Sequence, residues 1–112
     1  MNLEITEHTV RIIIASPKGR FDILSAPTVR AKLDELLAEG AVDFVVDLSE
    51  TLFLDSAGMA VLVSLLRRAR QAGGDAKLVW PGHEAARRVL TLTRFDRVFD
   101  IANSVEAALK CS

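Results

Sequence analysis

Residues 45–63 read VVDLSETLFLDSAGMAVLV and combine an apolar run, a short linker and an apolar helical segment. The run at 44–48 is typical of a buried strand, and residues 49–54 are expected to form the linker. The motif Asp55-Ser56-Ala57-Gly58 then opens a helix predicted to continue over residues 59–70. Asp and Ser favour such a start because their side-chain oxygens accept hydrogen bonds from the unpaired amides of the first turn. Either Asp55 or Ser56 can provide this cap.

Ser56 is therefore expected where a strand is followed by a helix, beside free backbone amides and a partial positive charge. Such a position suits a phosphate group. Two interpretations remain open from the residues alone. In one, the motif is only a helix cap, and Gly58 allows the helix to pack closely on the sheet. In the other, Ser56 binds a phosphate or carries one.

The helix after Ser56 has more apolar surface than one core face requires. At about 100° per residue, the residues on its core face are Gly58, Val61, Leu62, Leu65 and Ala69. Met59, Val63 and Leu66 fall largely outside this face, where a surface helix is usually polar. A neighbouring helix is expected to cover Leu66. Met59 and Val63 are expected to stay partly exposed as a protein-binding surface.

The rest of the chain alternates between strands and helices. Strands are predicted at 3–7, 10–15, 76–80 and 98–101 from alternating or β-branched apolar runs. A break at His8-Thr9 indicates an antiparallel first pair, and Pro17-Lys18-Gly19 is expected to end the second strand. Helical spacing predicts a helix from about residue 27 to Gly40, capped by Ser25 or Asp22. Two more helices are predicted at 84–92 and at the C-terminus, through residue 109.

This order predicts an α/β fold with a mixed, mostly parallel sheet of four to five strands, flanked by about four helices. The strand at 44–48 is expected at its centre. The residues expected to be buried are Phe44, Val45, Val46, Leu48, Val61, Leu62 and Leu65.

Composition narrows the possible functions. The chain has 112 residues, half of them hydrophobic and 26% charged, which is typical of one globular domain spanning 1–112. A net charge of −1 argues against nucleic-acid binding. No apolar run is long enough for a signal peptide or a bilayer span, so a cytoplasmic protein without direct membrane insertion is expected. The single cysteine, Cys111, is expected to be a free surface thiol.

Patterns for catalysis or metal binding are weak. Ser56 as a nucleophile needs a base, and neither His8 nor His83 lies in a recognisable catalytic setting. The Gly-x-Ser-x-Gly pattern is absent, as is the phosphate-binding loop pattern. The acidic residues near the motif lack histidine or cysteine partners at zinc spacing. The sequence therefore favours a protein that is not an enzyme and needs no cofactor or metal, with a small hydrolase as the weakest interpretation.

The block 47–59, DLSETLFLDSAGM, resembles the signature of STAS domains, specifically that of the bacterial anti-sigma-factor antagonists. The stretch Gly19-Arg20-Phe21-Asp22 is similar to the Gly-x-apolar-Asp loop of that family, and the element order agrees over essentially the whole chain. Two positions depart from the family pattern. Ala57 stands where many members have a second Ser or Thr, and Ala60 replaces a frequent glycine. Ser56 is thus the only acceptor hydroxyl in the motif.

The resemblance implies that Ser56 is phosphorylated by an anti-sigma factor that is also a serine kinase. It implies that the unphosphorylated protein binds this kinase and frees the sigma factor, and that a metal-dependent serine phosphatase resets the switch. The partner-binding residues expected on this basis are Asp22, Asp55, Ser56, Ala57, Gly58, Met59 and Val63. The alternative is a STAS subunit of a membrane transport complex for anions or lipids, or of a sensory complex, without a phospho-switch.

Overall fold

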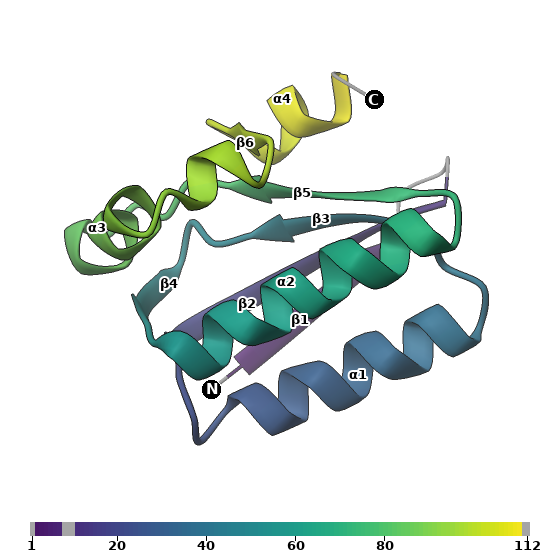
Figure 1. Ribbon diagram of the computed structural model, residues 1–112, viewed down its shortest axis with the longest axis horizontal. Coiled ribbons are helices and arrows are strands. Elements are labelled where there is room, and N and C mark those ends of the chain that lie inside the picture. Colours follow the sequence, from purple (N-terminus) through teal and green to yellow (C-terminus); the bar gives the residue numbers. More distant parts are fainter. Residues whose placement is uncertain (1, 8–10, 111–112) are drawn as a thin grey trace.

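The structure is a computed structural model that describes residues 2–7 and 11–110 (Figure 1). The elements follow in the order β1 (Asn2–Glu7), β2 (Ile12–Phe21), α1 (Ala26–Ala38), β3 (Asp43–Asp47), β4 (Thr51–Leu54), α2 (Ser56–Gln71), β5 (Asp75–Val79), α3 (Glu84–Leu92), the 3-10 turn η1 (Phe95–Arg97), β6 (Ile101–Ala102) and α4 (Val105–Lys110). The break predicted at His8-Thr9, the predicted strand start at Val10 and the thiol of Cys111 lie outside the described residues.

The strands form one mixed sheet in the order β1-β2-β3-β5-β6, with β4 paired to the end of β2. β1 and β2 are antiparallel, as the short break between them predicts, and the other pairs are parallel. β3 lies between β2 and β5, so the prediction of a central strand at 44–48 is confirmed. The alternation of strands and helices along the chain produces these parallel pairs because each helix carries the chain back to the start of the next strand.

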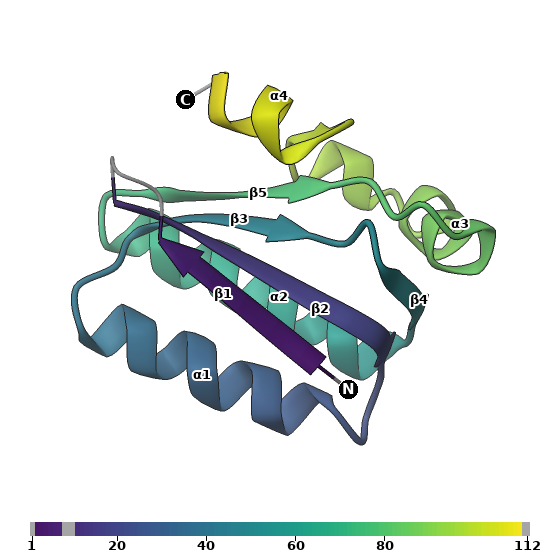
Figure 2. The ribbon, with the colours of Figure 1, turned by 180° about the vertical axis from the view of Figure 1, so that it is seen from behind.

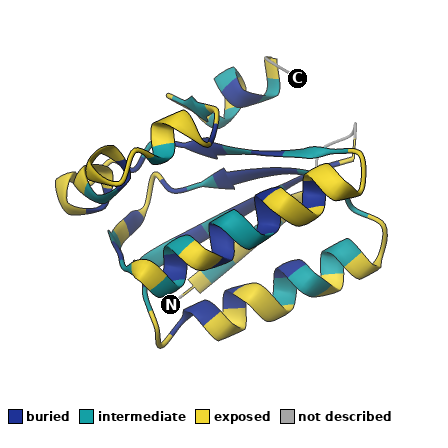
Figure 3. Ribbon diagram, viewed as in Figure 1, coloured by how far each residue is buried: buried dark blue, intermediate teal, exposed yellow. Residues whose placement is uncertain are grey.

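The helices cover the sheet unequally. α1 and α2 lie side by side on one face, whereas the short α4 packs on the other, as Figures 1 and 2 show. Successive residues of β3 point to opposite faces, so Phe44 joins the large cluster under α1 and α2, and Val45 joins a smaller cluster with Ala108 of α4. All seven residues predicted to be buried are buried. In Figure 3 the central strands are mostly buried, and much of α3 is exposed.

The predicted linker at 49–54 is wrong in part, because its last four residues form β4. This strand pairs in parallel with the end of β2 and brings the sheet to six strands. Thr51 is fully buried there, and its hydroxyl donates a hydrogen bond to the carbonyl of Pro17 over 2.7 Å. The contact joins segments that are far apart in sequence, so local patterning carries no sign of it.

Two predicted strand limits are also wrong. Pro17-Lys18-Gly19 does not end β2, which continues to Phe21 because β1 and then β4 pair with its second half. Gly19, with a φ of 95°, lies beside the register shift between β2 and β4. The last strand covers only Ile101–Ala102 rather than 98–101, since the preceding residues form η1 and Phe99 turns into the core. Among the described helices, none is long and apolar enough to cross a membrane.

Candidate functional site

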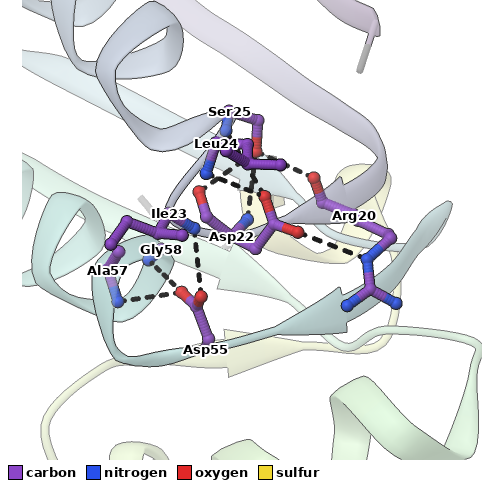
Figure 4. A network of polar contacts seen from close by, with 8 residues as sticks. All are labelled: Arg20, Asp22, Ile23, Leu24, Ser25, Asp55, Ala57 and Gly58. Carbon is purple, nitrogen blue, oxygen red and sulfur yellow. Dashed lines mark hydrogen bonds and ion pairs between the residues drawn. The ribbon is translucent and has the colours of Figure 1, made fainter.

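The N-terminus of α2 lies against the loop that joins β2 to α1. β2 and β4 are parallel neighbours that end together, with Phe21 paired to Leu54. Asp22 and Asp55 each follow directly, so two carboxylates from distant parts of the chain meet at the carboxyl end of adjacent strands (Figure 4). This edge is where α/β proteins commonly place ligand and partner sites. The topology thus brings together Asp22 and Asp55, which were both expected among the partner-binding residues.

Asp55 is the cap of α2. Its Oδ1 accepts hydrogen bonds from the backbone amides of Ala57 and Gly58 at 2.9 and 3.1 Å. Its Oδ2 accepts a third hydrogen bond, from the amide of Ile23 at 3.0 Å. One carboxylate thus satisfies two free amides of the helix start and also ties the β2–α1 loop to α2.

Ser56 is the first residue of α2 and is exposed. The question of whether Asp55 or Ser56 caps the helix is settled in favour of Asp55. Within residues 2–7 and 11–110, the hydroxyl of Ser56 makes no hydrogen bond to another residue. The fold therefore does not use this hydroxyl, which faces solvent at the positive end of a helix.

Asp22 organises the neighbouring loop rather than capping α1. Its Oδ1 accepts a hydrogen bond from the amide of Leu24 at 3.1 Å, and its Oδ2 accepts one from Nε of Arg20 at 3.2 Å. Ser25 occupies the N-cap position of α1 without a side-chain cap bond, because its hydroxyl instead donates to the carbonyl of Arg20 at 2.8 Å. The predicted capping by Ser25 or Asp22 is therefore wrong, since both side chains are used inside the loop.

This hydrogen-bond network stabilises the ionised form of Asp22. Burial of the carboxyl by itself raises its pKa, but the hydrogen bonds from Arg20, Leu24 and Ser25 and the charge of Arg20 outweigh burial. Together they hold the pKa of Asp22 below its ordinary value of 3.8. Asp22 is thus a carboxylate at neutral pH. The guanidinium of Arg20 also lies over the ring of Phe53, with 4.4 Å to its centroid, which fixes the pair beside β4.

Gly58 lets α2 approach the end of β2 closely. A Cβ placed on Gly58 would lie 2.4 Å from the carbonyl oxygen of Phe21, a distance that real Cβ atoms do not adopt. Ala57 beside it is half-buried and packs against the large core cluster. The small residues of the motif therefore bring Ser56 close to the β2–α1 loop.

Met59 and Val63 lie on the flank of α2 outside the core face. Both are half-buried, so the expectation that they remain partly exposed is confirmed. Leu66 is buried. Val63 and Leu66 also line a shallow hollow along α2 together with Arg67, Arg70 and Gln71. A partly apolar stripe thus runs from Met59, near Ser56, toward the C-terminal half of the helix.

Two apolar side chains of the loop were not singled out from the sequence. Ile23 is 70% exposed and Leu24 is 86% exposed, although both are large and apolar. They directly follow Asp22, and the amide of Ile23 is bonded to Asp55. The available signal was an apolar pair placed after a polar loop residue, but the same pattern is equally typical of residues leading into a helix.

Residues 3–108 match the model of the STAS domain family, and the chain belongs to that family. The anti-sigma-B factor antagonist of Bacillus subtilis is 29% identical over 114 residues, covering 98% of this chain and 100% of that protein. The crystal structure of a candidate anti-sigma factor antagonist from Thermotoga maritima has a TM-score of 0.87 and 28% identity, covering 96% of this chain and 92% of the other.

The phosphorylated form of the Bacillus cell fate determinant SpoIIAA also has this fold. Its TM-score is 0.76 at 19% identity, and the match covers 99% of this chain and 100% of that one. At this identity the likeness concerns the fold alone.

Proposed function

We propose that this protein is an anti-sigma factor antagonist whose binding is switched by phosphorylation of Ser56. The observation that carries the proposal is the exposed hydroxyl of Ser56, which Asp55 relieves of any capping duty. The general role is supported by the similarity to the anti-sigma-B factor antagonist of Bacillus subtilis. In the unphosphorylated state the protein binds an anti-sigma factor that is also a serine kinase, and the sigma factor is released.

The chemistry assigns this chain the part of a substrate. In the transfer, Oγ of Ser56 bonds to the γ-phosphorus of a nucleoside triphosphate on the partner, the bond to the β-phosphate oxygen breaks, and the diphosphate leaves. The hydroxyl proton needs an acceptor. Asp55 is the adjacent carboxylate, but three backbone amides already occupy it. The partner therefore supplies the base and the metal ion, and this chain is not an enzyme.

The proposed binding surface lies at the start of α2 and along its first half. Its members follow the end of β2, cap α2 or belong to the first half of α2: Asp22, Asp55, Ser56, Ala57, Gly58, Met59 and Val63. Gly58 is buried and contributes through the close packing of α2 on the end of β2. Met59 and Val63 supply half-buried apolar area, and the motif itself places the acceptor. A metal-dependent serine phosphatase in the same cytoplasmic compartment removes the phosphate and restores binding.

The test uses the full chain with ATP and each kinase-type anti-sigma factor of its own organism. We expect one of these kinases to add a single phosphate, mapped by mass spectrometry to Ser56. Ser56→Ala should lose that phosphate and still bind the kinase, whereas the exposed Ser49 provides the control Ser49→Ala, which should be phosphorylated normally. Failure of every kinase to modify or bind the wild-type chain would exclude the switch and favour a STAS subunit without one.

A further inference from the structure

We infer that Ile23 and Leu24 are the apolar anchors by which the partner kinase recognises this chain, and that Asp55 is the positioning residue that aligns them with Ser56. This inference rests on the proposed function. It adds two side chains to the binding surface and assigns a task to a hydrogen bond that the capping role of Asp55 does not require.

The two side chains are presented by a backbone that hydrogen bonds fix in place. The amide of Ile23 donates to Oδ2 of Asp55 at 3.0 Å, and the amide of Leu24 donates to Oδ1 of Asp22 at 3.1 Å (Figure 4). Their exposed fractions, 70% and 86%, are those of side chains that leave most of their apolar area in water. Large apolar residues held out on an ordered loop suit an interface, because their area is buried there at little cost in conformational entropy.

The position of the pair identifies the occupant. Asp55 bonds Ile23 directly and is followed in the chain by Ser56, so a protein that delivers a phosphate to Ser56 also covers this loop. An exposed apolar pair requires an apolar recess in that partner. We therefore expect the kinase to have an apolar pocket beside its phosphate donor. A membrane surface fits less well, since the carboxylates of Asp22 and Asp55 border the pair and repel anionic headgroups.

Asp55 has one oxygen for each of two tasks. Oδ1 holds the first turn of α2, and Oδ2 holds Ile23. Asn replaces Asp well as a helix cap, but its amide nitrogen cannot accept the hydrogen bond from Ile23. Asp55→Asn therefore separates the positioning role from the capping role.

The first experiment uses the kinase that modifies Ser56 of the wild-type chain. It compares the Kd, KM and kcat of this kinase for the wild-type chain and for the double variant Ile23→Ser, Leu24→Ser. We expect Kd and KM to rise by about tenfold or more with kcat little changed, because the anchors contribute binding that is equal in ground and transition states. The matched control is Val98→Ser, another exposed apolar residue at 48%, which lies between η1 and β6. Figures 1 and 2 place that segment across the sheet from the β2–α1 loop. The Kd of the kinase for Val98→Ser should therefore equal its Kd for the wild-type chain.

The second experiment needs no partner. Hydrogen exchange of the Ile23 amide should be slow in the wild-type protein and at least tenfold faster in Asp55→Asn, with a similar melting temperature. Equal protection in both proteins would overturn the positioning role.

The outcomes separate this inference from the proposed function. A wild-type chain that is bound and phosphorylated at Ser56, together with a double variant of unchanged Kd, overturns the anchors alone. A second outcome overturns the choice of partner. In it, the wild-type chain binds phosphatidylglycerol vesicles and the double variant does not, while both bind the kinase with the same affinity. Absence of any kinase binding by the wild-type chain overturns both proposals.

Discussion

Two residues at the start of α2, Asp55 and Gly58, determine how Ser56 is positioned. Asp55 accepts three backbone amide hydrogen bonds, so the hydroxyl of Ser56 has no capping role. Gly58 removes the side chain that would otherwise strike the carbonyl of Phe21. The position of Ser56 is thus fixed by contacts of Asp55 and Gly58 within the fold.

Gly58→Ala separates steric fit from helix propensity. Propensity alone predicts a gain of about 1 kcal/mol in the free energy of unfolding, because Ala is the better helix former. The contact of 2.4 Å with the Phe21 carbonyl predicts the opposite, a loss of about 1–3 kcal/mol, since the carbonyl is backbone and a Cβ has no rotamer that avoids it. Urea denaturation measures the difference. Ala60→Gly, at an exposed position of α2, reports propensity alone, and a Gly58→Ala protein as stable as wild type would refute the close packing.

Asp22 predicts a pH dependence with a definite sign. Its pKa in the folded protein lies below the unfolded value near 3.8, so its contribution to stability is complete above that value. The contribution is lost as pH falls through the folded pKa. Asp22→Asn should therefore be less stable than wild type at neutral pH, and the gap should narrow below about pH 3.8. Urea denaturation across this range measures it, with Asp96→Asn in the exposed η1 turn as control; a gap that widens on acidification would contradict the sign.

At the scale of elements, α2 presents three distinct surfaces. Its core face packs on the sheet, and a second flank meets α1, where Arg68 pairs with Asp34 and Arg30 donates a hydrogen bond to Ser64. The third flank carries Met59 and Val63 and is only half covered. Exposed ion pairs such as Arg68–Asp34 contribute at most about 1 kcal/mol each. The apolar core face therefore holds α2, and the third flank is open to a partner.

Met59→Lys tests the open flank. A lysine there can keep its ammonium in water, so the melting temperature should stay near that of wild type. Binding of the kinase should weaken by about tenfold or more, because the substitution places a charge in an apolar contact. Leu62→Lys, at a fully buried position of the same helix, is the matched control and should unfold the protein. A loss of melting temperature in Met59→Lys comparable to that control would show that Met59 belongs to the core.

Much of this element structure is predictable from the sequence, for a physical reason. The core face of α2 and the central β3 follow from apolar periodicity, and the helix start follows from Asp55 and Ser56. β4 and the length of β6 do not, because each depends on pairing with a distant strand. The exposure of Ile23 and Leu24 is not predictable either, because it depends on a loop whose amides bond to the carboxylates of Asp55 and Asp22.

At the scale of the whole molecule, the site occupies one end. α2 has 16 residues and is roughly 24 Å long, against a longest dimension of 32 Å, and Ser56 is its first residue. The opposite sheet face, with α4, belongs to a separate small cluster around Val45 and Ala108. A modification of Ser56 should therefore disturb few of the packing contacts that stabilise the fold.

Phosphorylation of Ser56 should consequently alter binding without altering the fold. A phosphate adds roughly −1.5 to −2 charge and three acceptor oxygens at the positive end of α2. That location is favourable by about 0.3–1 kcal/mol for an exposed charge, and repulsion from Asp55 opposes it. The two effects are small and opposite in sign, so the melting temperature should hardly move.

The interface gives the larger effect. There the phosphate introduces bulk and a charge that loses its water without gaining a matching cation, which commonly costs several kcal/mol. At about 1.4 kcal/mol per decade, the kinase should bind the phosphorylated protein at least a hundredfold more weakly. Ser56→Glu should follow the same direction with a smaller loss of affinity, and Ser56→Ala should bind constitutively. Thermal melts and binding titrations of these three proteins separate fold from interface. Equal kinase affinity for the phosphorylated and unphosphorylated chains would exclude the switch, whereas a large drop in melting temperature on phosphorylation would place its action in the fold.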